Sequence, residues 1–138
     1  MKRVRIAPVP EHPLQRQIAD ALRLGIAPPG KVSRDGVVWW SVDHASYSGT
    51  APGARLGRGI VAGVPDLFVL FRGLAHMIEV KTPAGELSDP QQSVMSAVLA
   101  SGGRVGVVRD ADEMLGLLDA WGIPRAQRLA MRTGRSVR

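Results

Sequence analysis

Three residues whose side chains can carry hydrolytic chemistry, Asp66, Glu79 and Lys81, lie in one short stretch of the chain. Two runs rich in apolar residues separate Asp66 from Glu79, and these runs meet at Arg72-Gly73. If Arg72-Gly73 is a two-residue hairpin loop, Asp66 lies directly opposite Glu79 on one face of the hairpin. Lys81 is two residues beyond Glu79 and therefore projects to the same face. The spacing predicts two carboxylates and one ammonium group at the open end of a hairpin.

Two opposed carboxylates repel each other, so something must offset their charge. Lys81 offers partial neutralisation, and a hard divalent cation such as Mg²⁺ does better because it prefers carboxylate oxygens. A metal-bound water beside a lysine is suited to attack on a phosphodiester. The structural alternative is an ion-paired strand surface. A three-residue loop would also turn Glu79 to the other face.

The elements that must position these residues follow from the apolar pattern. We expect a helix over 12–24, strands over 37–42, 66–71, 74–81 and 104–108, a helix opened by Ser88 and a last helix opened by Asp110. Strands 66–71, 74–81 and 104–108 are apolar at nearly every position, which favours a sheet covered on both faces. The order α-β-β-β-α-β-α indicates an α/β fold with a central sheet flanked by helices.

Side-chain patterns within these elements predict which residues are buried. The core face of the hairpin takes Leu67, Val69, Phe71, Ile78 and Val80. Ser88 and Gln91 have the spacing of a capping box, and Val94, Val98 and Leu99 are expected on one face of the helix that follows. Trp39 and Trp40 point to opposite faces of their strand, so one is expected in the core. His76 is expected to be structural.

Charge is distributed unevenly along the 138 residues. Eighteen Lys and Arg against twelve Asp and Glu give a net charge of +6, and the excess lies at the two ends of the chain. Basic ends suit a polyanion such as DNA, although a solubilising or disordered tail explains them equally well. We expect a basic arm over 1–10, one domain over 11–124 and a basic tail over 125–138.

Composition also excludes several classes of protein. The chain has no cysteine, so it has no disulfide, thiolate zinc site or cysteine nucleophile. Its three histidines form no His-Glu-x-x-His pattern, which excludes a zincin. Gly57-x-Gly59-x-x-Ala62 matches a dinucleotide fingerprint only by letter, because a strand rather than a helix follows it. No apolar run has the length of a membrane span or signal peptide, so a cytoplasmic protein is expected.

Several strings together resemble the VRR-NUC family of the PD-(D/E)XK nuclease superfamily. They are Gly53-Ala54-Arg55-Leu56, Ala62-Gly63-Val64-Pro65-Asp66-Leu67, Glu79-Val80-Lys81-Thr82-Pro83, Gly85, Leu87-Ser88, Gln91, Arg104-Val105, Val107-Val108-Arg109 and Trp121-Gly122-Ile123-Pro124. The resemblance covers roughly residues 11–124, and it implies a restriction-endonuclease-like core with a mixed sheet. The sequence departs from the family's pattern at Val42-Asp43-His44-Ala45, where many members have an Asn-Gly-type turn.

The resemblance also implies roles for individual residues. Asp66 and Glu79 would bind Mg²⁺, with Mn²⁺ as a substitute, and the backbone carbonyl of Val80 would be a further ligand. Lys81 would orient or activate the attacking water. Gln91 would contribute to the catalytic site, besides serving its capping box.

Other residues are weaker candidates. Glu11 occupies the place of an acidic residue that family members often carry, and would complete the metal shell or simply favour the helix dipole. Residues expected to meet nucleic-acid phosphates are Arg55, Arg58, Lys2, Arg3, Arg125 and Arg128.

The function expected from this resemblance is a metal-dependent DNA endonuclease. Stand-alone members of this size resemble phage or prophage nucleases, some of which act as homodimers on branched DNA such as four-way (Holliday) junctions. The alternative is a non-catalytic nucleic-acid-binding or replication accessory module on the same fold. The intact set of Asp66, Glu79 and Lys81 argues against that alternative.

Overall fold

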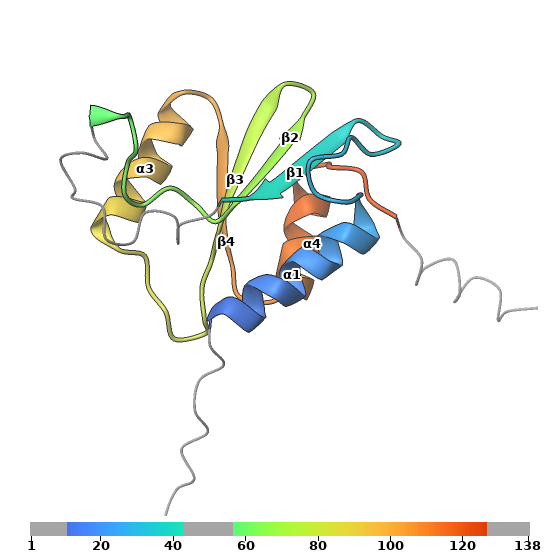
Figure 1. Ribbon diagram of the computed structural model, residues 1–138, viewed down its shortest axis with the longest axis horizontal. Helices are drawn as coiled ribbons and strands as arrows, with labels where there is room; N and C mark the ends of the chain where they lie inside the picture. The colour runs from blue at the N-terminus through green and yellow to red at the C-terminus, as the bar shows by residue number, and fades with distance from the viewer. Residues whose placement is uncertain (1–10, 43–56, 127–138) are drawn as a thin grey trace, which may run out of the picture.

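The computed structural model describes residues 11–42 and 57–126 of the chain. Within these ranges the elements are α1 (Glu11–Gly25), β1 (Val37–Ser41), β2 (Leu67–Phe71), β3 (Leu74–Val80), α3 (Asp89–Ala100), β4 (Arg104–Val108) and α4 (Ala111–Ala120). Figure 1 shows the sheet edge-on, with α3 on one side and α1 and α4 on the other. The predicted α/β class and restriction-endonuclease-like α-β-β-β-α-β core are confirmed. None of the described helices has the length and apolar character needed to cross a membrane.

The four strands form an open mixed sheet in the order β1-β2-β3-β4. The pairs β1–β2 and β2–β3 are antiparallel, and β3–β4 is parallel. Phe71 pairs with Leu74, so Arg72-Gly73 is the predicted two-residue loop. Both loop residues have positive φ, 52° for Arg72 and 74° for Gly73, as a type I′ turn requires. This turn fixes the register of the whole hairpin.

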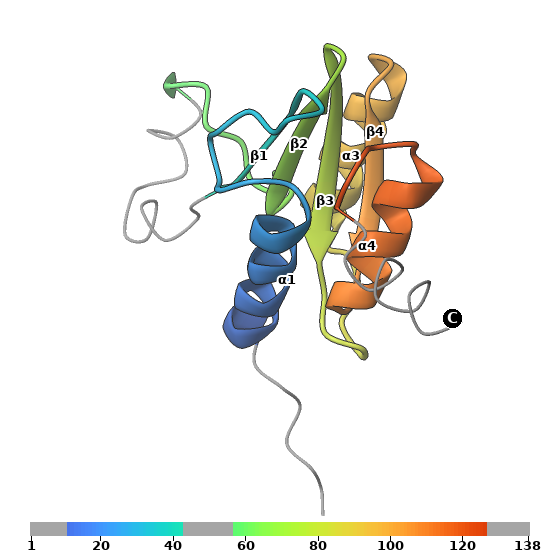
Figure 2. The ribbon, with the colours of Figure 1, turned by 90° about the vertical axis from the view of Figure 1, so that its right-hand side faces the viewer.

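The main core lies between the sheet and the layer of α1 and α4, which cross the near face of the sheet in Figure 2. Both helices contribute an apolar stripe at helical spacing, and the strands contribute alternate residues. The buried set is Leu14, Ile18, Ala19, Leu22, Val37, Trp39, Leu67, Val69, Ile78, Val80, Val108, Met114, Leu118 and Ile123, with Phe71 partly buried against it. The predicted core face of the hairpin is therefore confirmed, with Phe71 at its margin.

Helix α3 covers part of the opposite face of the sheet (Figure 1). Met95 is its buried residue, whereas Leu99 is 56% exposed. The expectation that Leu99 lines the packed face is therefore wrong. The buried or partly buried residues of α3 are Gln91, Val94, Met95 and Val98. The packed face is centred between these residues, and Leu99, one turn after Met95, lies at its exposed margin.

The outer edge of β1 is covered by the loop that precedes it. Gly30 N donates to Trp39 O over 2.8 Å, and Ser33 N donates to Val37 O over 2.7 Å. Trp39 is buried and its indole Nε1 donates to Ala27 O over 2.8 Å, while Trp40 stays 40% exposed on the other face and stacks on Phe68. The prediction that one tryptophan enters the core is confirmed, and the loop protects this edge from pairing with another strand.

His76 is buried on the core face, where its ring packs at 4.9 Å from that of Trp121. Burial lowers the pKa of His76 below its ordinary 6.5, and the nearby charge of Arg104 acts in the same direction. Backbone hydrogen bonds to the ring, one of them with Val69, oppose this shift without reversing it. The folded protein therefore holds His76 neutral in a range where the unfolded chain binds a proton.

The free energy of unfolding is expected to fall as the pH drops below 6.5 and to level off below the folded-state pKa of His76. The slope is at most about 1.4 kcal/mol per pH unit for one proton. His76→Gln removes the titrating group and should flatten this part of the profile. Urea unfolding at several pH values between 7.5 and 5 measures both proteins, and equal slopes would contradict the assignment.

Candidate active site

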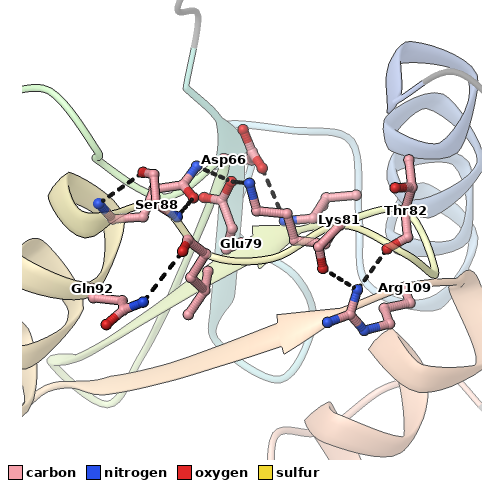
Figure 3. Close-up of polar contacts among 11 residues, drawn as sticks. Asp66, Glu79, Lys81, Thr82, Ser88, Gln92 and Arg109 are labelled. Carbon is pink, nitrogen blue, oxygen red and sulfur yellow. Dashed lines mark hydrogen bonds and ion pairs between the residues drawn. The ribbon is translucent and has the colours of Figure 1, made fainter.

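Asp66 lies directly before β2, at the open end of the hairpin, and is only 6% exposed. The register that pairs Leu67 with Ile78, continued by one residue, brings Asp66 opposite Glu79. Its Oδ2 accepts a hydrogen bond of 2.9 Å from Val80 N, the amide that follows Glu79 (Figure 3). This bond ties the start of β2 to the end of β3. β2 and β3 are each one residue shorter than expected at this end, which leaves Asp66 and Lys81 just outside the ladder.

Glu79 is the most deeply placed acidic side chain of the site, at 2% exposure. Its Oε1 accepts a hydrogen bond of 2.8 Å from Gln91 Nε2 and lies 3.7 Å from Lys81 Nζ. Figure 3 shows Asp66, Glu79 and Lys81 gathered at this end of the hairpin, with the ammonium group of Lys81 directed at the Glu79 carboxylate. The structure therefore brings Asp66, Glu79, Lys81 and Gln91 together, as the sequence predicts. Val80 belongs to the same group through its backbone.

Gln91 closes the capping box that the sequence predicts and also contacts Glu79. Ser88 caps α3, its Oγ accepting from Gln91 N at 3.3 Å, and Gln91 Oε1 accepts from Ser88 N at 2.9 Å. Because the amide oxygen of Gln91 is used by the cap, its Nε2 group is left to face Glu79. The capping box thus orients a side chain of the site at no cost in backbone hydrogen bonds.

Gly63 brings the segment before Asp66 against the first turn of α3. Its φ is +88°, and a Cβ built on it would lie 2.6 Å from Gln91 N and closer still to the carbonyl group of Pro90. Only glycine permits this approach of two backbones. Gly63 belongs to one of the strings that resemble the VRR-NUC family, but nothing local to it indicates a contact with Pro90, 27 residues later in the chain.

The donor set at this end of the hairpin fits a hard divalent cation. Mg²⁺ is commonly held by one or two carboxylates and completes its shell with waters and substrate phosphates. Asp66 and Glu79 supply two such carboxylates. Among the described residues, no third His, Asp or Glu side chain joins them to form a larger metal-binding cluster. Two buried carboxylates side by side are costly unless a cation neutralises them. This arrangement is suited to activating a water and stabilising charge on a phosphodiester.

The predicted third carboxylate, Glu11, begins α1, but its side chain lies outside the described part of the structure. The first turn of α1 and the loop after β3 lie at the same end of the molecule in Figures 1 and 2. A contribution of Glu11 to the metal shell therefore stays a prediction.

The candidate phosphate-binding residues divide into two groups. Arg55, Lys2, Arg3 and Arg128 lie outside the described residues, and Arg58 is exposed. Arg125 forms a two-pronged ion pair with Asp119, at 2.8 and 2.9 Å, which lowers the pKa of Asp119 and raises that of Arg125. Its neighbour Ala126 bonds to Gly25 at the end of α1, on the layer opposite the carboxylates. Arg125 is thus held away from Asp66 and Glu79.

Comparison with known protein families finds a match over the region of the chain that contains these residues. The family model of the VRR-NUC domain matches residues 46–112. The match spans β2, β3, α3 and β4 and includes all of the residues that meet around Glu79. No curated protein and no solved structure gives a significant match.

Proposed function

Because residues 46–112 belong to the VRR-NUC domain family, a family of nuclease domains, we propose that this protein is a metal-dependent DNA endonuclease. The observation that supports this proposal best is the convergence of Asp66, Glu79 and Lys81 at one end of a hairpin, with Gln91 oriented onto Glu79. Residues with these functional groups can bind a divalent cation and hydrolyse a phosphodiester bond.

In this proposal, Asp66, Glu79 and the carbonyl of Val80 hold Mg²⁺, with Mn²⁺ as a substitute. The metal supplies Lewis-acid activation of water and stabilisation of the charge that develops on the phosphate. Lys81, whose Nζ is kept 3.7 Å from Glu79 Oε1, orients the attacking water and offsets charge on the phosphate. Gln91 fixes the position of the Glu79 carboxylate by its hydrogen bond.

The proposed substrate is DNA. We extend the proposal to branched DNA, because some nucleases of the family that the chain resembles act on branched DNA. A homodimer would match the two-fold symmetry of such a substrate. A non-catalytic binding module on the same fold is less well supported, because phosphate binding alone gives no reason to bury Asp66 and Glu79 together.

Cleavage of labelled DNA tests the proposal. Four-way junction, flap, single-stranded and duplex substrates are incubated with the protein in Mg²⁺, Mn²⁺ or EDTA, beside the variant Lys81→Ala. We expect cleavage that depends on the metal and is lost in the variant. The substrate that is cleaved fastest identifies the DNA structure on which the protein acts. Tight, salt-sensitive binding without cutting of any substrate would instead favour the binding module.

Gln91→Ala is expected to lower the cleavage rate by about 10–100-fold, the usual cost of losing a residue that orients a ligand. It should also destabilise the protein by about 1 kcal/mol, because half of the capping box is lost. Single-turnover cleavage and thermal melting measure the two effects.

Ser88→Ala is the matched control for Gln91→Ala. It breaks the same cap but leaves the hydrogen bond between Gln91 and Glu79 possible. A similar loss of stability with a much smaller loss of rate is expected. If both variants slow cleavage equally, Gln91 acts through the helix cap alone.

A further inference from the structure

Arg109, the residue directly after β4, reaches across to the loop that follows Lys81. Its Nη1 donates to Thr82 O over 2.5 Å and to Gly85 O over 2.8 Å, as Figure 3 shows for the labelled Thr82. Gly85 N in turn donates to Thr82 O over 2.9 Å, which closes the loop into a turn. A single guanidinium nitrogen thus binds both carbonyl groups of this turn. Hydrogen bonds from a charged donor are the stronger kind.

Arg109 is itself held firmly. Its backbone N donates to Glu113 Oε2 over 2.6 Å, and Glu113 N donates to the capping side chain of Asp110 over 2.7 Å. The preceding residue, Val108, accepts a hydrogen bond of 3.0 Å from Lys81 N through its carbonyl. The capped start of α4 and the end of β4 therefore form a fixed support for the loop.

The loop over 82–87 connects two residues that meet at one atom. Lys81 precedes it and Gln91 lies in the first turn of the helix that it leads into, and both side chains approach Glu79 Oε1. The shape of the loop therefore governs how Lys81 and Gln91 are placed relative to each other. An error of about 1 Å in such placement can slow catalysis by about 100-fold.

We propose that Arg109 is a positioning residue of the active site, which holds the 82–87 loop in the shape that sets Lys81 and Gln91 around Glu79. This inference rests on the proposed nuclease function for its catalytic consequence. Its structural part, the ordering of the loop by the guanidinium group, is measured without any cleavage.

Three variants test it: Arg109→Ala, Arg109→Lys and, as the matched control, Arg104→Ala, which removes an exposed arginine from the other end of β4. The first readout is hydrogen exchange of the amides in 82–87, followed by mass spectrometry in EDTA. We expect faster exchange in Arg109→Ala, a smaller increase in Arg109→Lys, whose shorter ammonium side chain keeps the charge, and none in Arg104→Ala.

The second readout is the kinetics of metal-dependent cleavage. Arg109→Ala is expected to lower kcat by about 10–100-fold with little change in KM, because the residue acts on placement rather than on substrate affinity. Partial rescue in Arg109→Lys distinguishes this role from simple loss of folding, and melting temperatures identify any variant that is unfolded. If Arg109→Ala is unfolded, Arg109→Lys alone decides the comparison with Arg104→Ala.

Two results would overturn the proposal. Unchanged exchange in 82–87 for both Arg109 variants shows that the guanidinium does not order the loop. Faster exchange with a kcat equal to that of Arg104→Ala shows that the loop does not position the site. If the unmodified protein cleaves no DNA, the proposed function and the catalytic part of this inference fail together, while the exchange data still decide whether Arg109 orders the loop.

Discussion

Asp66→Asn is expected to abolish metal-dependent cleavage while leaving the protein folded, with a melting temperature in EDTA equal to or above that of the unmodified protein. The asparagine Oδ1 can still accept the hydrogen bond from Val80 N, which the structure gives as 2.9 Å. The negative charge is lost, and with it both the repulsion from Glu79 and one of the proposed metal ligands. The loss of several kcal/mol of charge stabilisation should lower the cleavage rate by a factor of about 10³ or more. Cleavage assays and thermal melting provide the measurements.

Asp66→Ala separates the charge of Asp66 from its hydrogen bond. This variant leaves the buried Val80 N–H without its acceptor, which costs about 1–3 kcal/mol. It should therefore melt below Asp66→Asn in EDTA, although both are inactive. Added Mg²⁺ or Mn²⁺ is expected to raise the melting temperature of the unmodified protein and of neither variant. If Asp66→Asn is as unstable as Asp66→Ala in EDTA, the two carboxylates are not opposed in the way the register indicates.

The register of the hairpin, and with it the core of the site, could be predicted from local information. Two apolar runs of matched length meet at Arg72-Gly73, and a two-residue loop allows only one alternation of faces. The site follows from this alternation because Asp66 and Glu79 lie at the same step of it. The capping box of Ser88 and Gln91 is equally local, since it joins residues three apart.

The details that the sequence did not determine are contacts between distant segments. Met95 and Leu99 lie one turn apart on the same side of α3, and only the contact with the sheet centres the packed face on Val94, Met95 and Val98 and leaves Leu99 exposed. Arg125 is one of several basic residues near the end of the chain, and only its proximity to Asp119 in the folded protein shows that its charge is already paired. Such contacts are hard to predict from residue types, because the same side chain is compatible with many different surface positions.

The contacts that shape the site are of this distant kind. Arg109 reaches Thr82 and Gly85 from the end of β4, 27 and 24 residues away in the sequence. Gly63 meets the backbone at Pro90 and Gln91. Both residues stand in the strings that resemble the VRR-NUC family, but the reason for their presence becomes visible only when β2, β4 and α3 are packed together.

Gly63→Ala is expected to cause the largest loss of stability of any single methyl group added near the site. A positive φ costs a non-glycine residue about 1–2 kcal/mol. The added Cβ would also lie 2.6 Å from Gln91 N and closer to the Pro90 carbonyl, and such overpacking costs about 1–3 kcal/mol more. Backbone atoms at the start of a capped helix cannot move aside as the end of a flexible side chain can. Urea unfolding measures the change in the free energy of unfolding.

Gly36→Ala isolates the part of this cost that comes from the backbone angle. Gly36 has a φ of +85°, almost that of Gly63, but no atom within 4 Å of a Cβ built on it. It should lose only the cost of the positive φ and keep its full cleavage rate. Gly63→Ala should lose more stability and also cleave more slowly, because separating residue 63 from α3 moves Asp66 relative to Gln91. Equal losses in the two variants would mean that the segment before Asp66 yields freely, and that its contact with α3 does not set the geometry of the site.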